Sequence, residues 1–458
     1  MNANLNPTLR TIPPLDSEFR PAVLENKRHL QAVRNPSTVV IGLEREHGLI
    51  SRYETTVDRD SLTDALRYIE RIVKFLLWAR GGWRIYFGGP RAIGEQIRRC
   101  YSPSGERAFD VELMSRVYER PFEVVLMGAD EVPLEKECGS ALGGRLDGCR
   151  IGFDLGASDY KVAAVNDGEV VYNDEFPWKP KDHHDPLYHY GHLNRALKKA
   201  AQHLPRVDAI GGSTAGVVVD NKIMVASLFR AVPTDKLDDA KNLFLRLRRE
   251  WGVPLEVAND GDVTALAGAM SLSAGGVLGL AMGSSEAGGF IDQQGRILGW
   301  LNELAFAPVD GNPAAPADEW SGDRGVGALY FSQQAVNRLL APASVDLPRE
   351  MDVPERLKRV QELMAQDDPR AAKIYETIGV YLGYTIPHYD SFYNFRHVLI
   401  LGRVTTGAGG NIILAKAREI LHTEFPQLAE RVAVHLPDEK NRRVGQAVAA
   451  ASLPAITR

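Results

Sequence analysis

The chain has 458 residues, of which 44% are hydrophobic and 25% charged, and its formal net charge is −5 at pH 7. This length suits two or three domains, each able to bury its own core. The negative balance, with no block of like charges, does not indicate a large basic face for nucleic acid. Cys100, Cys138 and Cys149 are irregularly spaced, which indicates reduced thiols and neither a disulfide framework nor a zinc set. With no apolar leader and no apolar run long enough to span a bilayer, we expect a cytoplasmic protein without a membrane partner.

The first 137 residues divide into an arm and a small domain. Residues 1–30 contain Pro13, Pro14 and Pro21 and little periodicity, which predicts an arm that wraps the body or stays loose. Residues 31–137 mix strand signals with a helical repeat of apolar residues that starts near Ser61. We therefore expect an additional α/β domain here and no three-helix DNA reader, so DNA is not an expected partner.

A second α/β pattern starts after a predicted linker at residues 138–150, which is rich in glycine and small residues. Residues 150–176 predict a β-hairpin with its turn at Asn166-Asp167-Gly168. A helix and a strand ending in two glycines follow, the same order as in residues 38–90. Either an internal duplication with a degenerate first copy or the ordinary alternation of α/β proteins explains this order.

Two segments that follow predicted strands carry acidic residues. In the first, Asp154 to Ser158, Gly156 lets a phosphate approach the backbone, Ser158 could bind its oxygens, and Asp154 could hold a hydrated Mg²⁺. An ordinary turn explains the same residues. In the second, Asn259-Asp260, the aspartate could accept the proton of a substrate hydroxyl during phosphoryl transfer. The alternative for this pair is a helix N-cap.

Two further segments are glycine turns after apolar strands. Residues 283–289 could clasp the phosphates of a nucleotide through Gly283 and Ser284. The turn that begins at Gly402 and continues through residues 405–410 into a helix could receive an adenosine. Single glycine turns are common, and it is the shared order of all four segments, each at a strand end, that points to a nucleotide-binding fold.

That order resembles the ROK family (repressors, uncharacterised frames and sugar kinases) of the actin, hexokinase and Hsp70 superfamily. FDLGASDYKVAAV is similar to the family's phosphate motif D-x-G-G-T-x-x-R-x-A, and LEVANDGDVTALAGA to E-N-D-A-N-x-A-A-L. ILGWLNELAFAPVD is similar to G-x-x-G-E-I-G-H-M-x-V-D, LILGRVTTGAGG to the adenosine-site glycines, and RRVGQAVAAA to the terminal helix. The resemblance covers residues 151–458 and implies an α/β, actin-like (ribonuclease H-like) two-lobed kinase fold.

The resemblance also implies an activity, the ATP-dependent phosphorylation of a sugar or related polyol with Mg²⁺. Asp260 would be the catalytic base, and Asn259, Glu303 and Gly212 would hold the substrate. The residues implied at the nucleotide and its phosphates are Asp154, Gly156, Ser158, Gly283, Ser284, Gly402, Gly407, Gly409 and Gly410. Asp154 would also hold Mg²⁺ through water. A small-molecule sugar and a second copy of the chain in a homodimer are the expected partners.

Several residues depart from the family pattern. Phe306 stands where the family has a zinc-binding and sugar-contacting histidine, and Val326 where it has a cysteine, so we expect no structural zinc and an altered sugar site. Asp159 and Glu286 lie in the two phosphate turns, where each carboxylate would either repel a triphosphate or point to solvent. Lys161 could compensate Asp159.

Histidines concentrate in residues 182–192, where Asp182-His183-His184-Asp185 precedes His189 and His192. They could bind a metal or a polar substrate, or form a surface loop without a metal. The departures as a whole leave an alternative function open, that of a non-catalytic relative which binds a sugar or nucleotide as a sensor or scaffold.

Overall fold

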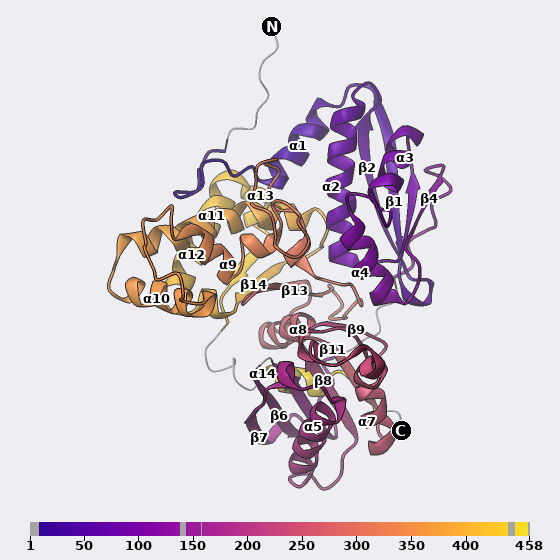
Figure 1. Cartoon of the computed structure of the whole chain (residues 1–458), viewed down its shortest axis with the longest axis vertical. Coiled ribbons are helices and arrows are strands. Elements are labelled where there is room, and N and C mark those ends of the chain that lie inside the picture. The colour runs from indigo at the N-terminus through magenta and orange to yellow at the C-terminus, as the bar shows by residue number, and fades with distance from the viewer. Residues whose placement is uncertain (1–8, 138–142, 157, 438–444, 457–458) are drawn as a thin grey trace. The chain divides into compact units, whose positions relative to one another are not determined.

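The computed structural model describes residues 9–137, 143–156, 158–437 and 445–456, which divide into two compact units (Figure 1). The first unit combines residues 1–138, 280–288 and 300–436. The second combines residues 139–279, 289–299 and 437–458. Within the described ranges, no helix has both the length and the apolar character needed to cross a membrane.

A four-stranded sheet forms the N-terminal part of the first unit, in the order β2-β1-β3-β4. Strand β1 pairs antiparallel with β2 and β3, and β3 pairs parallel with β4. The elements are β1 (Pro36–Glu44), β2 (Ile50–Asp58), α2 (Leu62–Arg80), β3 (Arg84–Gly88), α3 (Arg91–Cys100), α4 (Ala108–Tyr118) and β4 (Glu123–Met127). Every residue of α2 from Ile72 to Arg80 is buried, because both the sheet and later segments of the chain cover this helix.

The predicted arm contains a helix, α1 (Ala22–Ala32), which begins directly after Pro21. Before it, the backbone N–H of Leu15 donates to Thr377 Oγ1 at 3.2 Å, and the Asp16 carboxylate accepts bonds from Arg338 and Tyr381. The described part of the arm therefore packs on the later helices of its own unit.

The remainder of the first unit is built around a long buried helix, α11 (Pro369–Asp390), and its partner α12 (Ala408–Glu424). Gly379 and Gly383 of α11 face α12, where an added Cβ would lie 2.7 Å from Lys416 and 2.8 Å from Ile420. Glycine at these points lets the two helices approach closely. The other elements are α9 (Gln333–Leu339), α10 (Val353–Ala365), β14 (His397–Leu401), α13 (Pro426–Ala429) and β15 (Ala433–His435). Strands β14 and β15 belong to a four-stranded sheet in the order β13-β12-β14-β15. Its other strands, β12 (Val277–Met282) and β13 (Glu286–Ile291), have residues 280–282 and 286–288 in the first unit and their remaining residues in the second.

A five-stranded sheet in the order β11-β8-β5-β6-β7 is the centre of the second unit. Strands β5, β6 and β7 form an antiparallel meander, and β8 pairs parallel with both β5 and β11. Asp167 and Gly168 have φ of 48° and 87°, as a two-residue hairpin turn requires, so the predicted turn is confirmed. The strands are β5 (Cys149–Leu155), β6 (Asp159–Asn166), β7 (Glu169–Pro177), β8 (Ala209–Thr214), β9 (Val217–Val219), β10 (Lys222–Val225) and β11 (Leu255–Asn259); the helices are α5 (Pro186–Ala201), α6 (Leu237–Lys241), α7 (Leu243–Trp251), α8 (Asp260–Leu272) and α14 (Gly445–Ala451).

Helix α14 lies directly on this sheet because two strand glycines leave room for its backbone. An added Cβ at Gly152 of β5 would lie 1.8 Å from the carbonyl oxygen of Ala447, and one at Gly211 of β8 would lie 1.7 Å from that of Ala450. Residues Ala447 and Ala450 are themselves buried. The contact between small residues places the preceding residue of α14, Gln446, beside Ser213 of β8.

The two hairpin–helix–strand patterns differ in strand direction. In the N-terminal sheet β1 and β3 are antiparallel, whereas the corresponding β5 and β8 are parallel. The difference arises because the second unit has a third meander strand, β7, before its helix. Internal duplication stays a prediction. Of the predicted linker, residues 138–142 lie outside the described part, and Cys149 and Arg150 already belong to β5.

Candidate functional site

Asp154 lies on β5 directly beside Ser213 of β8, because the parallel register of these strands pairs the two residues. Its side chain is 8% exposed, and Ser213 Oγ donates to Asp154 Oδ1 at 2.7 Å. Burial raises the pKa of the Asp154 carboxyl, and the Ser213 hydrogen bond opposes that rise. Asp154 is therefore a buried carboxylate that a cation would stabilise.

Gln446 connects this pair to the second predicted acidic segment. Its Nε2 donates to Ser213 Oγ at 3.1 Å and to the backbone oxygen of Asp260 at 3.4 Å. Ser213 and Gln446 were missed from the sequence, since nothing in the sequence alone reveals the strand register. Gln446 is the one polar side chain in the stretch GQAVAAA, and this was the available signal.

Asn259 takes the capping role that the sequence left as one alternative for this pair, and the base role of Asp260 stays a prediction. Asn259 is the N-cap of α8: its Oδ1 accepts the N–H of Gly261 at 2.7 Å, and its Nδ2 donates to the Gly216 oxygen at 2.8 Å. Asp260 is the first residue of the helix and does not serve as the cap. Burial and the nearby charge of Asp154 raise the pKa of Asp260 to about 7. An aspartate with such a pKa is suited to accept a proton near neutral pH.

The first phosphate turn uses much of its hydrogen-bonding capacity internally. The Gly156 N–H donates to the Asp159 oxygen at 2.9 Å, and Ser158 Oγ donates to Asp159 Oδ2 at 2.9 Å. Lys161 Nζ lies 3.7 Å from Asp159 Oδ1, so the lysine does lie beside this carboxylate. Ser158 is exposed, and its role at a phosphate stays a prediction.

Gly212 and the histidine-rich segment have structural surroundings in the second unit. An added Cβ at Gly212 would lie 2.1 Å from the Phe153 ring, so packing in the core already requires glycine there. His189 is 1% exposed, and its Nε2 lies 3.0 Å from the Pro180 oxygen. His183 stacks on Tyr188 with ring centroids 3.5 Å apart. Within the described residues, no group of three or more His, Cys, Asp and Glu side chains could hold a metal ion.

The two predicted nucleotide turns of the first unit lie at the ends of neighbouring strands. Gly283 and Ser284 follow β12, and Gly402 follows β14 with φ of 100°. An added Cβ at Gly402 would lie 2.5 Å from the Met282 oxygen, so these strand ends touch. Gly407 precedes α12, has φ of 69° and faces open space. Gly409 and Gly410 instead pack against Tyr375 and the backbone of Thr405.

Glu303 belongs to a segment that α2 holds through its backbone. The N–H groups of Leu301, Asn302 and Glu303 donate to the carbonyl oxygens of Arg80, Ala79 and Trp78, at 3.3, 2.9 and 3.0 Å. Phe306 packs on Trp78 and Phe109 with ring centroids 4.4 and 5.6 Å apart. The phenylalanine at the expected histidine position therefore contacts the N-terminal region of the chain. Asp154 and Asp260 lie in the other unit, so their convergence with Glu303 stays a prediction.

Glu286 points away from solvent. It is 2% exposed and accepts a hydrogen bond from Tyr389 at 3.2 Å, and among the described residues its Oε2 has no hydrogen-bond partner. Burial raises the pKa of the Glu286 carboxyl to about 8. The solvent-facing alternative for Glu286 is thus wrong, because the side chain fills the space that Gly327 leaves.

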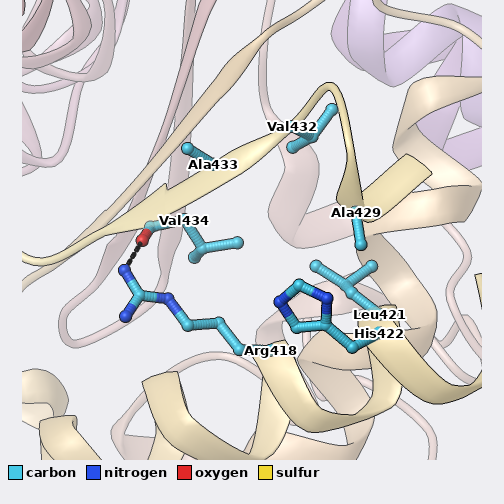
Figure 2. A pocket seen from close by; sticks show the side chains of 7 residues that line it. All are labelled: Arg418, Leu421, His422, Ala429, Val432, Ala433 and Val434. Atoms are coloured by element: carbon cyan, nitrogen blue, oxygen red, sulfur yellow. Dashed lines mark hydrogen bonds between the residues drawn. The ribbon is translucent and has the colours of Figure 1, made fainter. Parts of the chain in front are cut away.

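A pocket of about 190 Å³ lies elsewhere in the first unit, between α12, α13 and β15 (Figure 2). Its lining is Arg418, Leu421, His422, Ala429, Val432, Ala433 and Val434. Arg418 reaches across it to the Val434 oxygen. None of the residues predicted for the functional site lines this pocket.

Comparison with solved structures identifies the fold. A ROK hexokinase from Thermus thermophilus is 17% identical and matches 66% of this chain and 96% of its own, with a TM-score of 0.53. A ROK glucokinase from Streptomyces griseus, in complex with glucose and AMPPNP, is 18% identical over 66% and 98% of the chains, with a TM-score of 0.48. A putative N-acetylmannosamine kinase from Listeria monocytogenes is 14% identical over 66% and 97%, with a TM-score of 0.48. No family model and no curated protein matches the chain. The hexokinase match confirms the predicted actin-like α/β fold.

Proposed function

We propose that this chain, which has the fold of a ROK hexokinase, is an ATP-dependent kinase of a sugar or related polyol. The observation that carries the proposal is Asp260, an aspartate at the start of a helix that leaves the capping to its neighbour and whose pKa is raised to about 7. In this role Asp260 accepts the proton of the substrate hydroxyl as that oxygen attacks the γ-phosphorus of ATP, whose bond to the bridging oxygen breaks so that ADP leaves.

Asp154 supports the same proposal. Its carboxylate is buried beside Asp260, and Ser213 supplies only one hydrogen bond to it. Mg²⁺ prefers oxygen ligands and commonly takes one or two carboxylates together with water and phosphate, so this donor set fits the ion. Bound there, Mg²⁺ would neutralise phosphate charge. Glu303, Asn259 and Gly212 remain the proposed sugar contacts, with the nucleotide at the turns that begin at Gly156, Gly283 and Gly402.

The test is calorimetric titration of the full chain with Mg-ATP, followed by a screen for sugar-dependent ADP release. We expect Asp154→Ala to weaken Mg-ATP binding at least tenfold, and Asp260→Asn to retain binding and lose turnover by a factor of at least 100. Asp174→Asn is the matched control, since Asp174 lies on β7 of the same unit and pairs with Lys199 away from these residues. Unchanged turnover in Asp260→Asn would reject the proposed base.

One observation favours a second candidate, a non-catalytic sensor or scaffold of the same fold. The Gly156 N–H and the Ser158 hydroxyl both donate within their own turn, which leaves fewer donors for a phosphate. In that case calorimetry would detect sugar binding without Mg-ATP binding, and no sugar would stimulate ADP release. The homodimer, the cytoplasmic location and the lack of a DNA or membrane partner stay predictions.

A further inference from the structure

One face of α2 carries basic and aromatic side chains at helical spacing. Arg67, Arg71, Lys74 and Trp78 follow one another at intervals of four, three and four residues, which places them on the same side of the helix. Such a stripe on an ordinary helix of an α/β domain would face solvent. Here Lys74 and Trp78 are both 0% exposed.

The partner of this face is the segment of residues 301–324. Arg67 donates to the Gly311 oxygen at 2.7 Å, and Arg71 donates to the oxygens of Asp310 and Arg324 at 2.7 and 3.2 Å. At the C-terminal end of α2, the last three carbonyl oxygens accept the N–H groups of residues 301–303. The segment is therefore bound to α2 from one end of the helix to the other.

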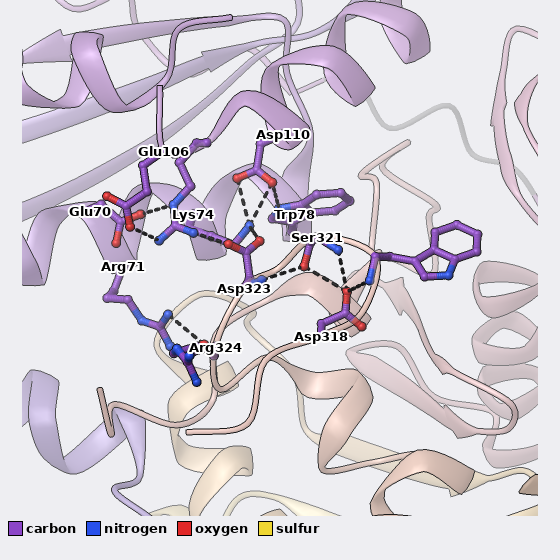
Figure 3. A network of polar contacts seen from close by, with 12 residues as sticks. Glu70, Arg71, Lys74, Trp78, Glu106, Asp110, Asp318, Ser321, Asp323 and Arg324 are labelled. Carbon is purple, nitrogen blue, oxygen red and sulfur yellow. Dashed lines mark hydrogen bonds and ion pairs between the residues drawn. The ribbon is translucent and has the colours of Figure 1, made fainter. Parts of the chain in front are cut away.

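A buried ionic network binds the C-terminal end of the segment to the middle of α2 (Figure 3). Lys74 Nζ lies 2.5 Å from Asp323 Oδ2 and 2.9 Å from Asp110 Oδ2, while Arg107 pairs with Asp323 and Glu70. Asp323 is 7% exposed and Asp110 0%. Removing one partner from a buried ion pair leaves an uncompensated charge, so these contacts are costly to break.

We propose that α2 is a rigid support that fixes the backbone of residues 301–324. Lys74 and Asp323 are then positioning residues that hold Glu303 in place to bind the substrate. The part of the inference that concerns substrate rests on the proposed function. Glu303 itself would touch the substrate, whereas Lys74 and Asp323 act through the backbone that carries it. The N-terminal region is in this way a component of the substrate site.

The chain offers a matched pair of variants. Asp323→Asn and Asp110→Asn each remove one buried carboxylate that contacts Lys74, but only Asp323→Asn removes ion pairs between the segment and the N-terminal region, those of Asp323 with Lys74 and Arg107. Asp110 lies on α4, and its loss leaves the Lys74–Asp323 and Arg107–Asp323 pairs in place. If Asp323→Asn fails to fold, Lys74→Met/Asp110→Asn/Asp323→Asn removes the lysine together with both carboxylates that contact it, so that none of the three is left as an unpaired buried charge.

The first readout is hydrogen exchange, which does not depend on activity. We expect the amides of residues 301–303 to exchange at least tenfold faster in Asp323→Asn than in Asp110→Asn, with α12 unaffected in both. Equal exchange in the two variants would overturn the proposal that α2 supports the backbone of residues 301–324. If no sugar binds the wild-type chain, the proposed function fails. Hydrogen exchange still tests whether α2 supports the backbone of residues 301–324.

The second readout is the sugar itself. With a sugar identified by the ADP-release screen, we expect Asp323→Asn to raise KM for the sugar at least tenfold, with Mg-ATP affinity within threefold of Asp110→Asn. A merely structural role would weaken sugar and nucleotide together. Asp323→Glu restores the charge, and recovery of the wild-type KM in this variant would support the positioning role. The same KM in Asp323→Asn and Asp110→Asn would overturn it.

Discussion

At the scale of single residues, the pKa of Asp260 predicts how activity depends on pH. Burial and the Asp154 charge raise this pKa to about 7, and a base must be ionised to accept a proton. We therefore expect kcat/KM, which reports the pKa values of the free enzyme, to rise about tenfold per pH unit below pH 7 and to level off above it. A pH–rate profile with the identified sugar measures this. A profile that is flat from pH 5.5 to 8 would contradict the assignment.

Glu286 gives a residue-scale prediction for stability. Its pKa is about 8 in the folded chain and 4.5 in the unfolded one, so the folded state binds the extra proton between these values. Stability contributed by the protonated carboxyl is complete below pH 4.5 and is lost as the pH rises towards 8. We expect the wild type to lose up to about 1.4 kcal/mol per pH unit across this window relative to Glu286→Gln.

Denaturant unfolding at pH 5 and pH 8 measures the Glu286 effect. Glu419→Gln is the control, because Glu419 is an exposed residue of α12 that pairs with Lys416. Equal pH dependence in the wild type and Glu286→Gln would show that the buried carboxyl is not the cause.

At the scale of elements, the packing of α14 on the second sheet depends on two glycines. An alanine at Gly152 would place its Cβ 1.8 Å from the Ala447 oxygen, where neither backbone can give way without moving the helix. Overpacking of this kind costs on the order of 1–3 kcal/mol, so we expect the free energy of unfolding to fall by about that amount.

The control for Gly152→Ala is Gly191→Ala in the same unit. Gly191 lies within α5, and an added Cβ there would meet only the tip of Arg195 at 3.9 Å. Alanine is favoured over glycine in a helix interior by roughly 0.5–1 kcal/mol, so this variant should be slightly more stable. If both variants are equally destabilised, the close contact of α14 is not responsible.

Element order and several turns could be predicted from the sequence, because apolar periodicity and turn residues are local signals. The hairpin turn at Asp167-Gly168 is one example. The pairing of Asp154 with Ser213 could not be predicted, since it depends on the register between strands almost 60 residues apart. For the same reason, the sequence could not predict that residues 301–324 cover the side of α2 that carries Lys74. The spacing of apolar and polar residues along a helix does not show which distant segment packs on it.

At the scale of the whole molecule, the compact units do not follow chain order. The sequence suggested that residues 31–137 form a domain separate from residues 151–458, whereas residues 1–138 cluster with 280–288 and 300–436. Composition and turn signals mark where elements end, but contacts between distant segments decide which elements share a core.

This arrangement predicts the behaviour of a truncated chain. A protein that starts at residue 143 lacks α2, which leaves the N–H groups of Leu301, Asn302 and Glu303 and the ring of Phe306 without their present partners. We expect it to be largely insoluble or to lack a cooperative unfolding transition, as measured by soluble yield and thermal denaturation. A soluble fragment with the stability of the full chain would contradict this expectation.

The ionic face of α2 also has a consequence for synthesis on the ribosome. Lys74 and Arg107 emerge early, whereas their partner Asp323 follows more than 200 residues later. At roughly 5–20 residues per second, that interval lasts on the order of 10–40 seconds. During this time Lys74 and Arg107 have their N-terminal partners Asp110 and Glu70 but not Asp323, and the ring of Trp78 is not covered by Phe306. The contacts that bury this face of α2 can therefore form only after residues 301–324 have been made.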